Sequence, residues 1–157
     1  MKICDLIECS YDIDILGITD DSRDVEDNYL FVATKGFNVD HFDYIDDAIE
    51  KGASFIISDR NINRDFPHVV VDNINDFYIE LCSKFYNVSP NEFNLIGITG
   101  TDGKTTTSTV IAQLINGMAC IGTNGVILDG EYYPTNNTTP CISELYNSLS
   151  LIKGYNC

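Results

Sequence analysis

The chain has 157 residues, of which 44% are hydrophobic, so it is long and apolar enough to bury a core. Its formal net charge of −15 would repel nucleic acid and anionic membrane surfaces, so we expect neither as a partner. No apolar run approaches the ~20 residues of a membrane-spanning helix, and the acidic N-terminus does not resemble a signal peptide, so we expect a cytoplasmic location.

The first part of the chain alternates short apolar runs with helical patterns. Strands are predicted at 29–33, 53–58 and 68–71, and helices at 41–51 and 75–86. Strands interleaved with helices indicate an α/β layer structure. The stretch 87–92 is polar, contains Pro90 and has no periodicity, so we place a domain boundary there. The predicted domains are therefore residues 1–90 and 91–157.

A glycine-rich segment at 97–107 is the strongest functional signal. It reads Gly-Ile-Thr-Gly-Thr-Asp-Gly-Lys-Thr-Thr-Thr, after a predicted short buried strand at 94–99 and at the start of a predicted helix at 104–116. Glycines let the backbone approach an anion closely, and the N–H groups of a helix start can bind it. Lys104 adds a positive charge, and the hydroxyl of Thr105 can ligate magnesium. The segment predicts a site for the phosphates of ATP.

The remainder of the second domain is short. Gly117 can end the helix, and residues 118–122 are predicted as the second strand of a parallel pair that the helix connects. A nucleotide-binding domain also needs an acidic residue after an apolar strand. The two candidates, Asp59 and Asp72, precede the glycine-rich segment and are interpreted as turn or capping residues. We therefore expect the second domain to be incomplete.

Four segments in order resemble the Mur ligases of bacterial cell-wall synthesis, and within them the tripeptide synthetases. The first is Asp21-Ser-Arg with Leu30-Phe-Val-Ala and Gly36, and the second is Val39-Asp-His-Phe with Gly52-Ala. The third is the glycine-rich segment itself, in which Ile98 replaces the glycine of the general phosphate-loop pattern. The fourth is Ile121-Gly-Thr with Asn137-Thr-Thr-Pro. The resemblance implies a small N-terminal α/β domain that binds a UDP substrate, followed by the start of a phosphate-loop central domain.

The resemblance also assigns roles to residues of this sequence. Ser22 and Asn38 would contact the UDP portion of UDP-N-acetylmuramoyl-dipeptide, and Asn137, Thr138 and Thr139 would contact the same substrate near its phosphates and peptide. ATP would be held by Gly100, Thr101, Asp102, Gly103, Lys104, Thr105 and Thr106, with Lys104 as the catalytic residue and Thr105 facing Mg²⁺. The implied reaction joins a third amino acid to the dipeptide through an acyl phosphate.

Two positions depart from the family pattern, because Asp40 stands for a usual glycine and Cys141 for a commonly acidic residue. The family's later glutamate, histidine and carbamylated lysine, and its C-terminal domain, do not occur in this sequence. We therefore expect the chain alone not to complete the ligation. A noncatalytic UDP-sugar or nucleotide-binding module, and a small phosphate-loop kinase or ATPase, remain open alternatives, and neither the third amino acid nor the oligomeric state can be read from the sequence.

Overall fold

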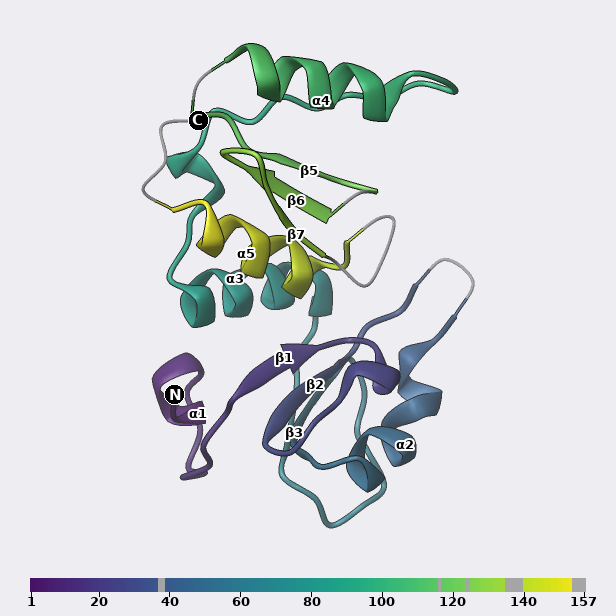
Figure 1. Cartoon of the computed structure of the whole chain (residues 1–157). Coiled ribbons are helices and arrows are strands. Elements are labelled where there is room, and N and C mark those ends of the chain that lie inside the picture. Colours follow the sequence, from purple (N-terminus) through teal and green to yellow (C-terminus); the bar gives the residue numbers. More distant parts are fainter. Residues whose placement is uncertain (37–38, 116, 124, 135–139, 154–157) are drawn as a thin grey trace. The chain divides into compact units, whose positions relative to one another are not determined.

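The chain folds into two units, residues 1–85 and 86–157 (Figure 1). The structure is a computed structural model that describes residues 1–36, 39–115, 117–123, 125–134 and 140–153. No helix within these ranges is both long enough and apolar enough to cross a bilayer. Each unit has its own sheet and is described separately.

Unit 1 contains a four-stranded sheet in which every neighbouring pair is parallel, in the order β1-β2-β3-β4. Its strands are β1 (Gly17–Thr19), β2 (Tyr29–Ala33), β3 (Ala53–Ser58) and β4 (His68–Val70). Its helices are α1 (Ile3–Leu6), the 3-10 turns η1 (Ser22–Asp24) and η2 (His41–Tyr44), α2 (Ile45–Glu50) and α3 (Ile74–Tyr86). The predicted α/β class is confirmed, as are the strands expected at 29–33, 53–58 and 68–71.

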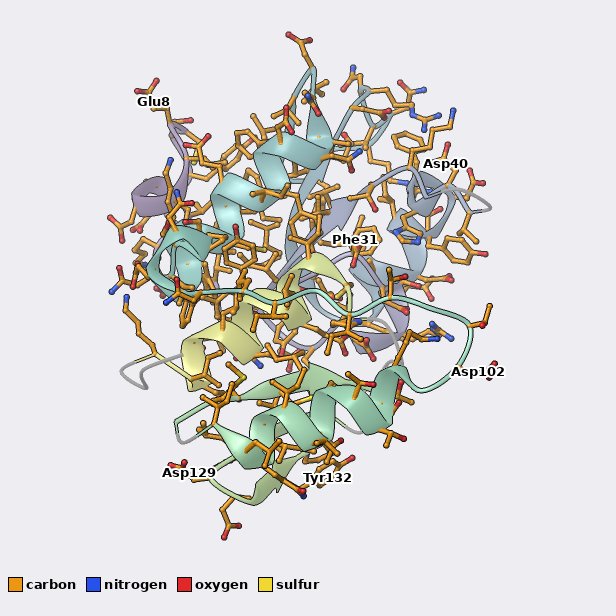
Figure 2. All side chains as sticks on the ribbon, turned by 90° about the horizontal axis from the view of Figure 1, so that it is seen from above. Glu8, Phe31, Asp40, Asp102, Asp129 and Tyr132 are labelled. Atoms are coloured by element: carbon orange, nitrogen blue, oxygen red, sulfur yellow. The ribbon has the colours of Figure 1, made fainter. Side chains whose placement is uncertain are left out.

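The two central strands form the core of unit 1. The side chains of Phe31 on β2 and of Phe55 and Ile56 on β3 are completely buried, and Figure 2 shows Phe31 enclosed among other side chains. Continuous apolar runs of this kind are expected where helices or loops cover both faces of a parallel sheet. Strand β1 was not predicted, because its three residues are too few to show a pattern. Its Gly17 lets the ring of Tyr29 lie close to the backbone, because an added Cβ would be 2.4 Å from that ring and would make it move.

The two predicted helices of unit 1 are present. The expected helix at 41–51 divides into η2 and α2, and Gly52 follows with φ of +109°, which favours glycine because it has no Cβ. Helix α3 turns Ile74, Tyr78 and Leu81 into the core at helical spacing. Two hydrogen bonds join α3 to the rest of unit 1: the Tyr78 hydroxyl donates to Asp20 Oδ1 at 3.4 Å, and Lys84 Nζ donates to the carbonyl oxygen of Leu6 at 3.5 Å.

Unit 2 combines two helices with a small antiparallel sheet in the order β5-β6-β7. Its elements are the 3-10 turn η3 (Pro90–Glu92), α4 (Lys104–Leu114), β5 (Cys120–Gly122), β6 (Gly125–Leu128), β7 (Glu131–Tyr133) and α5 (Ile142–Leu151). Between β6 and β7, Asp129 and Gly130 have φ of +50° and +85°. An Asp-Gly pair with two positive φ angles is the preferred two-residue hairpin turn, since it matches the twist of the strands.

Two predictions for unit 2 are wrong. Residues 94–99 form no strand, and Leu95 and Ile96 are each 61% exposed rather than buried. A single extended segment is not stable as a strand without a neighbour for its N–H and C=O groups, and no strand among the described residues pairs with it. Consequently β5 has no parallel partner, and it pairs with β6 in the antiparallel sense instead.

Candidate functional site

The glycine-rich loop of unit 2 leads directly into α4. Gly103 is the N-cap residue with φ of +77°, and Gly100 has φ of +152°, so both adopt backbone conformations that L-residues disfavour. The first N–H groups of a helix lack intrahelical acceptors, and a glycine cap supplies no side-chain oxygen for them. The start of α4 therefore presents free backbone donors, which is the arrangement that binds phosphate.

Lys104 places its ammonium group over this loop. Its Nζ donates to the carbonyl oxygen of Gly100 at 2.5 Å and lies 3.4 Å from the carbonyl oxygen of Thr101. The side chains of Asp102, Thr105 and Thr106 are exposed around it. The structure thus gathers the predicted residues 100–106 at one place, with a positive charge next to the helix N-terminus.

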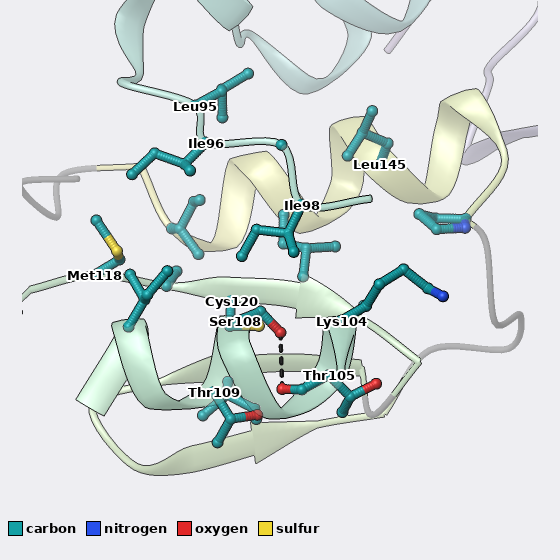
Figure 3. A pocket seen from close by; sticks show the side chains of 18 of the residues that line it. Leu95, Ile96, Ile98, Lys104, Thr105, Ser108, Thr109, Met118, Cys120 and Leu145 are labelled. Atoms are coloured by element: carbon teal, nitrogen blue, oxygen red, sulfur yellow. Dashed lines mark hydrogen bonds between the residues drawn. The ribbon is translucent and has the colours of Figure 1, made fainter. Parts of the chain in front are cut away.

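A cavity of about 510 Å³ borders the first turn of α4 (Figure 3). Its polar side includes Lys104, Thr105 and Ser108, whose Oγ donates to the carbonyl oxygen of Thr105 at 3.0 Å. Its apolar side includes Leu95, Ile96, Ile98, Ile111, Met118, Ile121, Leu145 and Leu149. The volume lies within the range of about 300–1,000 Å³ that is usual for small-molecule sites. A phosphate bound at the loop would therefore lie beside a space large enough for the rest of a ligand.

Thr105 is compatible with the predicted magnesium contact. No cluster of three or more His, Cys, Asp or Glu side chains able to hold a metal occurs among the residues that the structure describes. Mg²⁺ bound to a nucleotide does not need such a cluster, because phosphates and water supply most of its ligands. One exposed hydroxyl at the first turn of α4 therefore fits the ion.

The second group of predicted residues lies in unit 1, directly after β1. Asp21 caps η1 by accepting a hydrogen bond from the backbone N–H of Arg23 at 2.8 Å. Ser22 is only 8% exposed, and its hydroxyl makes no hydrogen bond to any residue that the structure describes. No fully buried side-chain oxygen or nitrogen among the described residues lacks a partner, so the Ser22 hydroxyl is open to solvent and can hydrogen-bond to a ligand.

The Asp21 carboxylate also binds the Arg23 guanidinium through three short contacts. These hydrogen bonds lower the pKa of Asp21 below its ordinary value, and partial burial opposes them. A depressed pKa in the folded state adds stability above the unfolded-state pKa of about 3.9, and the stability is lost as pH falls through the folded-state pKa.

We therefore expect Asp21→Asn to lower the free energy of unfolding at pH 7 by about 1 kcal/mol or less, since the Arg23 partner is exposed. The difference from the wild type should shrink below about pH 4. Urea denaturation at pH 7 and below about pH 4 measures the difference. The control is Glu8→Gln, at an exposed acidic residue of unit 1 that has no ion pair with the described residues. A deficit of the same size at both pH values would contradict the role of the ion pair.

Asp40, one of the departures from the family pattern, has a defined structural role. Its carboxylate accepts from the backbone N–H of Phe42 at 3.1 Å and from the Arg60 guanidinium at 2.5 Å. The hydrogen bond from Arg60 is the main cause that lowers the pKa of Asp40. Arg60 in turn lies 4.4 Å above the ring of Phe42. Asp40 therefore begins η2 and fastens it to the loop after β3.

The structure adds three residues that sequence reasoning did not select. Thr34 Oγ1 lies 3.3 Å from Asp20 Oδ2 and 3.0 Å from His41 Nδ1. Asp20 follows β1 and Thr34 follows β2, so the carboxyl ends of two neighbouring parallel strands bring them together. The sequence signal that could have identified them is a polar residue directly after each of two parallel strands. Ligands of open α/β sheets bind at the carboxyl edge, where these residues lie.

Four predicted substrate contacts cannot be placed. Asn38, Asn137, Thr138 and Thr139 lie outside the described residues. Of the predicted site, the structure therefore places the loop residues in unit 2 and Ser22 in unit 1.

Comparison with known proteins gives consistent matches for both units. Residues 14–86 match the Mur ligase family, catalytic domain, and residues 98–155 match the Mur ligase middle domain. The UDP-N-acetylmuramoyl-L-alanyl-D-glutamate--2,6-diaminopimelate ligase of Bacillus cereus is 35% identical over 96% of this chain and 33% of its own length. The UDP-N-acetylmuramyl-tripeptide synthetase 2 of Oceanobacillus iheyensis is 35% identical over 80% of this chain and 27% of its own length.

Among solved structures, a UDP-N-acetylmuramoyl-L-alanyl-D-glutamate--2,6-diaminopimelate ligase aligns with a TM-score of 0.65 and 24% identity. The alignment covers 97% of this chain and 33% of that one, and it supports the fold. The chain spans about a third of the length of these relatives. The two family models together match most of both units, and the resemblance seen in the sequence is confirmed: the chain belongs to the Mur ligase family.

Proposed function

We propose that unit 2 binds the triphosphate of ATP at residues 100–106. The observation that supports this most strongly is the glycine-capped start of α4, with Lys104 held over the loop and the cavity alongside. Lys104 would bridge the outer phosphates and Thr105 would face Mg²⁺, which neutralises phosphate charge when it is bound. Each group opposes the negative charge of the triphosphate in a chain whose net charge is −15.

Unit 1 would bind the UDP portion of UDP-N-acetylmuramoyl-L-alanyl-D-glutamate. The unpaired hydroxyl of Ser22 and the polar residues at the carboxyl edge of the parallel sheet support this assignment. Asn38, together with Asn137, Thr138 and Thr139 of the other unit, is proposed to contact the same substrate on the strength of the family resemblance alone. The domain limits 1–90 and 91–157 belong to this proposal too.

The reaction to which these sites belong would be the ATP-dependent addition of a third amino acid in the cytoplasm. The name of the Bacillus cereus relative describes a 2,6-diaminopimelate ligase, and the name of the Oceanobacillus iheyensis relative describes a tripeptide synthetase. In that reaction the terminal carboxylate of the dipeptide would take the γ-phosphoryl group of ATP and release ADP, which gives an acyl phosphate. An amine would then attack the acyl carbon and displace phosphate to form the amide. Lys104 would stabilise the charge that develops on the transferred phosphoryl group.

Titration calorimetry with UDP-N-acetylmuramoyl-L-alanyl-D-glutamate tests the UDP site. Ser22→Ala should weaken binding by about five- to tenfold, since it removes one hydrogen bond to the ligand. Ser10→Ala, which changes an exposed serine of the same unit, serves as the matched control and should not alter the affinity.

Absence of binding at millimolar ligand by a folded chain would count against the UDP site. Appreciable ATP turnover by the chain alone, without the UDP substrate, would instead favour a small phosphate-loop kinase or ATPase. Binding of both ligands without any turnover would fit a noncatalytic module. It would also fit a chain that spans only about a third of the length of its relatives.

A further inference from the structure

Three polar residues of unit 1 meet at the carboxyl edge of its sheet. Asp20 and Thr34 follow the adjacent parallel strands β1 and β2. His41 begins η2 and is tied to the same edge, because its backbone N–H donates to the carbonyl oxygen of Thr34 at 3.0 Å. The backbone therefore holds the three side chains in one place before any side-chain contact is considered.

The hydrogen bonds among these side chains determine where the protons lie. Thr34 has one hydroxyl proton, and its Oγ1 is 3.3 Å from Asp20 Oδ2 and 3.0 Å from His41 Nδ1. A carboxylate can only accept, so the Thr34 proton goes to Asp20. The hydroxyl oxygen must then accept from His41, which places a proton on Nδ1.

Electrostatics favours the same arrangement. His41 Nδ1 lies 3.9 Å from Asp20 Oδ2, a separation at which a carboxylate attracts an N–H group and repels a bare lone pair. The other carboxylate oxygen, Oδ1, is 3.4 Å from the hydroxyl of Tyr78 on α3. Tyr78 is completely buried, so it helps to hold the orientation of Asp20 from the neighbouring helix.

We propose that Asp20 is a positioning residue that, through Thr34, fixes neutral His41 as the Nδ1–H tautomer. Nε2 is then an acceptor, and it makes no hydrogen bond to the residues that the structure describes. The His41 side chain is 26% exposed, so Nε2 can receive a donor from a ligand. This part of the inference rests on the proposed UDP site: the donor is the imide N–H of the uracil ring or a ribose hydroxyl.

Imidazole ¹⁵N spectra of the whole chain test the tautomer without any ligand. At about pH 9, well above the ordinary imidazole pKa of about 6.5, the wild type should show His41 protonated at Nδ1. Asp20→Leu frees the Thr34 proton, which can then be donated to Nδ1, so the proton should move to Nε2. Thr34→Val removes the nearer acceptor of Nδ1–H but leaves Asp20 Oδ2 3.9 Å from Nδ1, so the Nδ1–H tautomer should decrease by less than in Asp20→Leu.

Tyr78→Phe is the matched control, because it removes a hydrogen bond from Asp20 but leaves the contact with Thr34. It should keep the Nδ1–H tautomer. His68, whose Nδ1 lies 2.9 Å from the carbonyl oxygen of Phe66, is an internal reference that should not change in any variant. An Nε2–H tautomer in the wild type, or the same tautomer in wild type and Asp20→Leu, would overturn the positioning role.

UDP titration then tests the ligand part. Asp20→Leu should weaken UDP binding by about five- to tenfold, because Nε2–H cannot accept the ligand's proton. Unchanged affinity in a variant whose tautomer has inverted would overturn the ligand role of Nε2. If the wild type fails to bind UDP, the proposed function fails while the tautomer result still stands on its own measurement.

Discussion

Replacing Lys104 by methionine should weaken MgATP binding by about ten- to hundredfold. The change removes charge-assisted hydrogen bonds to phosphate, each worth about 1.5–3 kcal/mol. The apolar part of the side chain is kept. The fold should be unaffected because Lys104 is exposed, and its hydrogen bonds to the described residues go to carbonyl oxygens of its own loop. Calorimetry with MgATP gives the affinity, and circular dichroism checks the fold.

Lys84→Met is the matched control for this experiment. Lys84 is an exposed lysine on α3 that pairs with Glu80, so its replacement changes the net charge by the same amount. The control should bind MgATP like the wild type. Equal affinity of Lys104→Met and the wild type, or no binding by the wild type at millimolar MgATP, would argue against the phosphate site.

Replacing Phe31 by alanine should lower the free energy of unfolding of unit 1 by about 3–5 kcal/mol. Phe31 is completely buried at the centre of β2 and packs with Val25, Ile45 and Ile56. Its removal loses apolar burial and leaves a cavity. Because folded domains are stable by only about 5–15 kcal/mol, this loss should also weaken UDP binding at 37 °C.

Urea denaturation measures the change, and Tyr44→Ala is the control. Tyr44 is an aromatic residue of the same unit that is 42% exposed, so its truncation should cost about 1 kcal/mol or less. A loss below about 1 kcal/mol in Phe31→Ala would mean that β2 is not the centre of the core.

Strong local patterns explain which elements were predicted. Strands β2 and β3 are continuous apolar runs because both faces are buried, and α3 repeats its buried residues at helical spacing. The loop before α4 was recognised because glycine, lysine and threonine occur together at a helix start. In each of these cases the signal lies within a few consecutive residues.

Unit 2 shows where local patterns fail. The run Leu95-Ile-Gly-Ile has the composition of a buried strand, yet Leu95 and Ile96 are exposed. A strand requires a paired neighbour, which composition cannot supply. The hairpin of β6 and β7 was overlooked, although Asp129 and Gly130 are a recognisable turn signal.

The sequence by itself determined the family, the α/β class and the glycine-rich loop that leads into a helix, because motifs of consecutive residues encode all three. Only the tertiary structure decided that Asp20, Thr34 and His41 share one hydrogen-bond network and that Asp40 pairs with Arg60. It also decided that β5 pairs antiparallel with β6. These features depend on which chain segments become neighbours in space, and pairing between distant residues leaves no periodic trace in a single sequence.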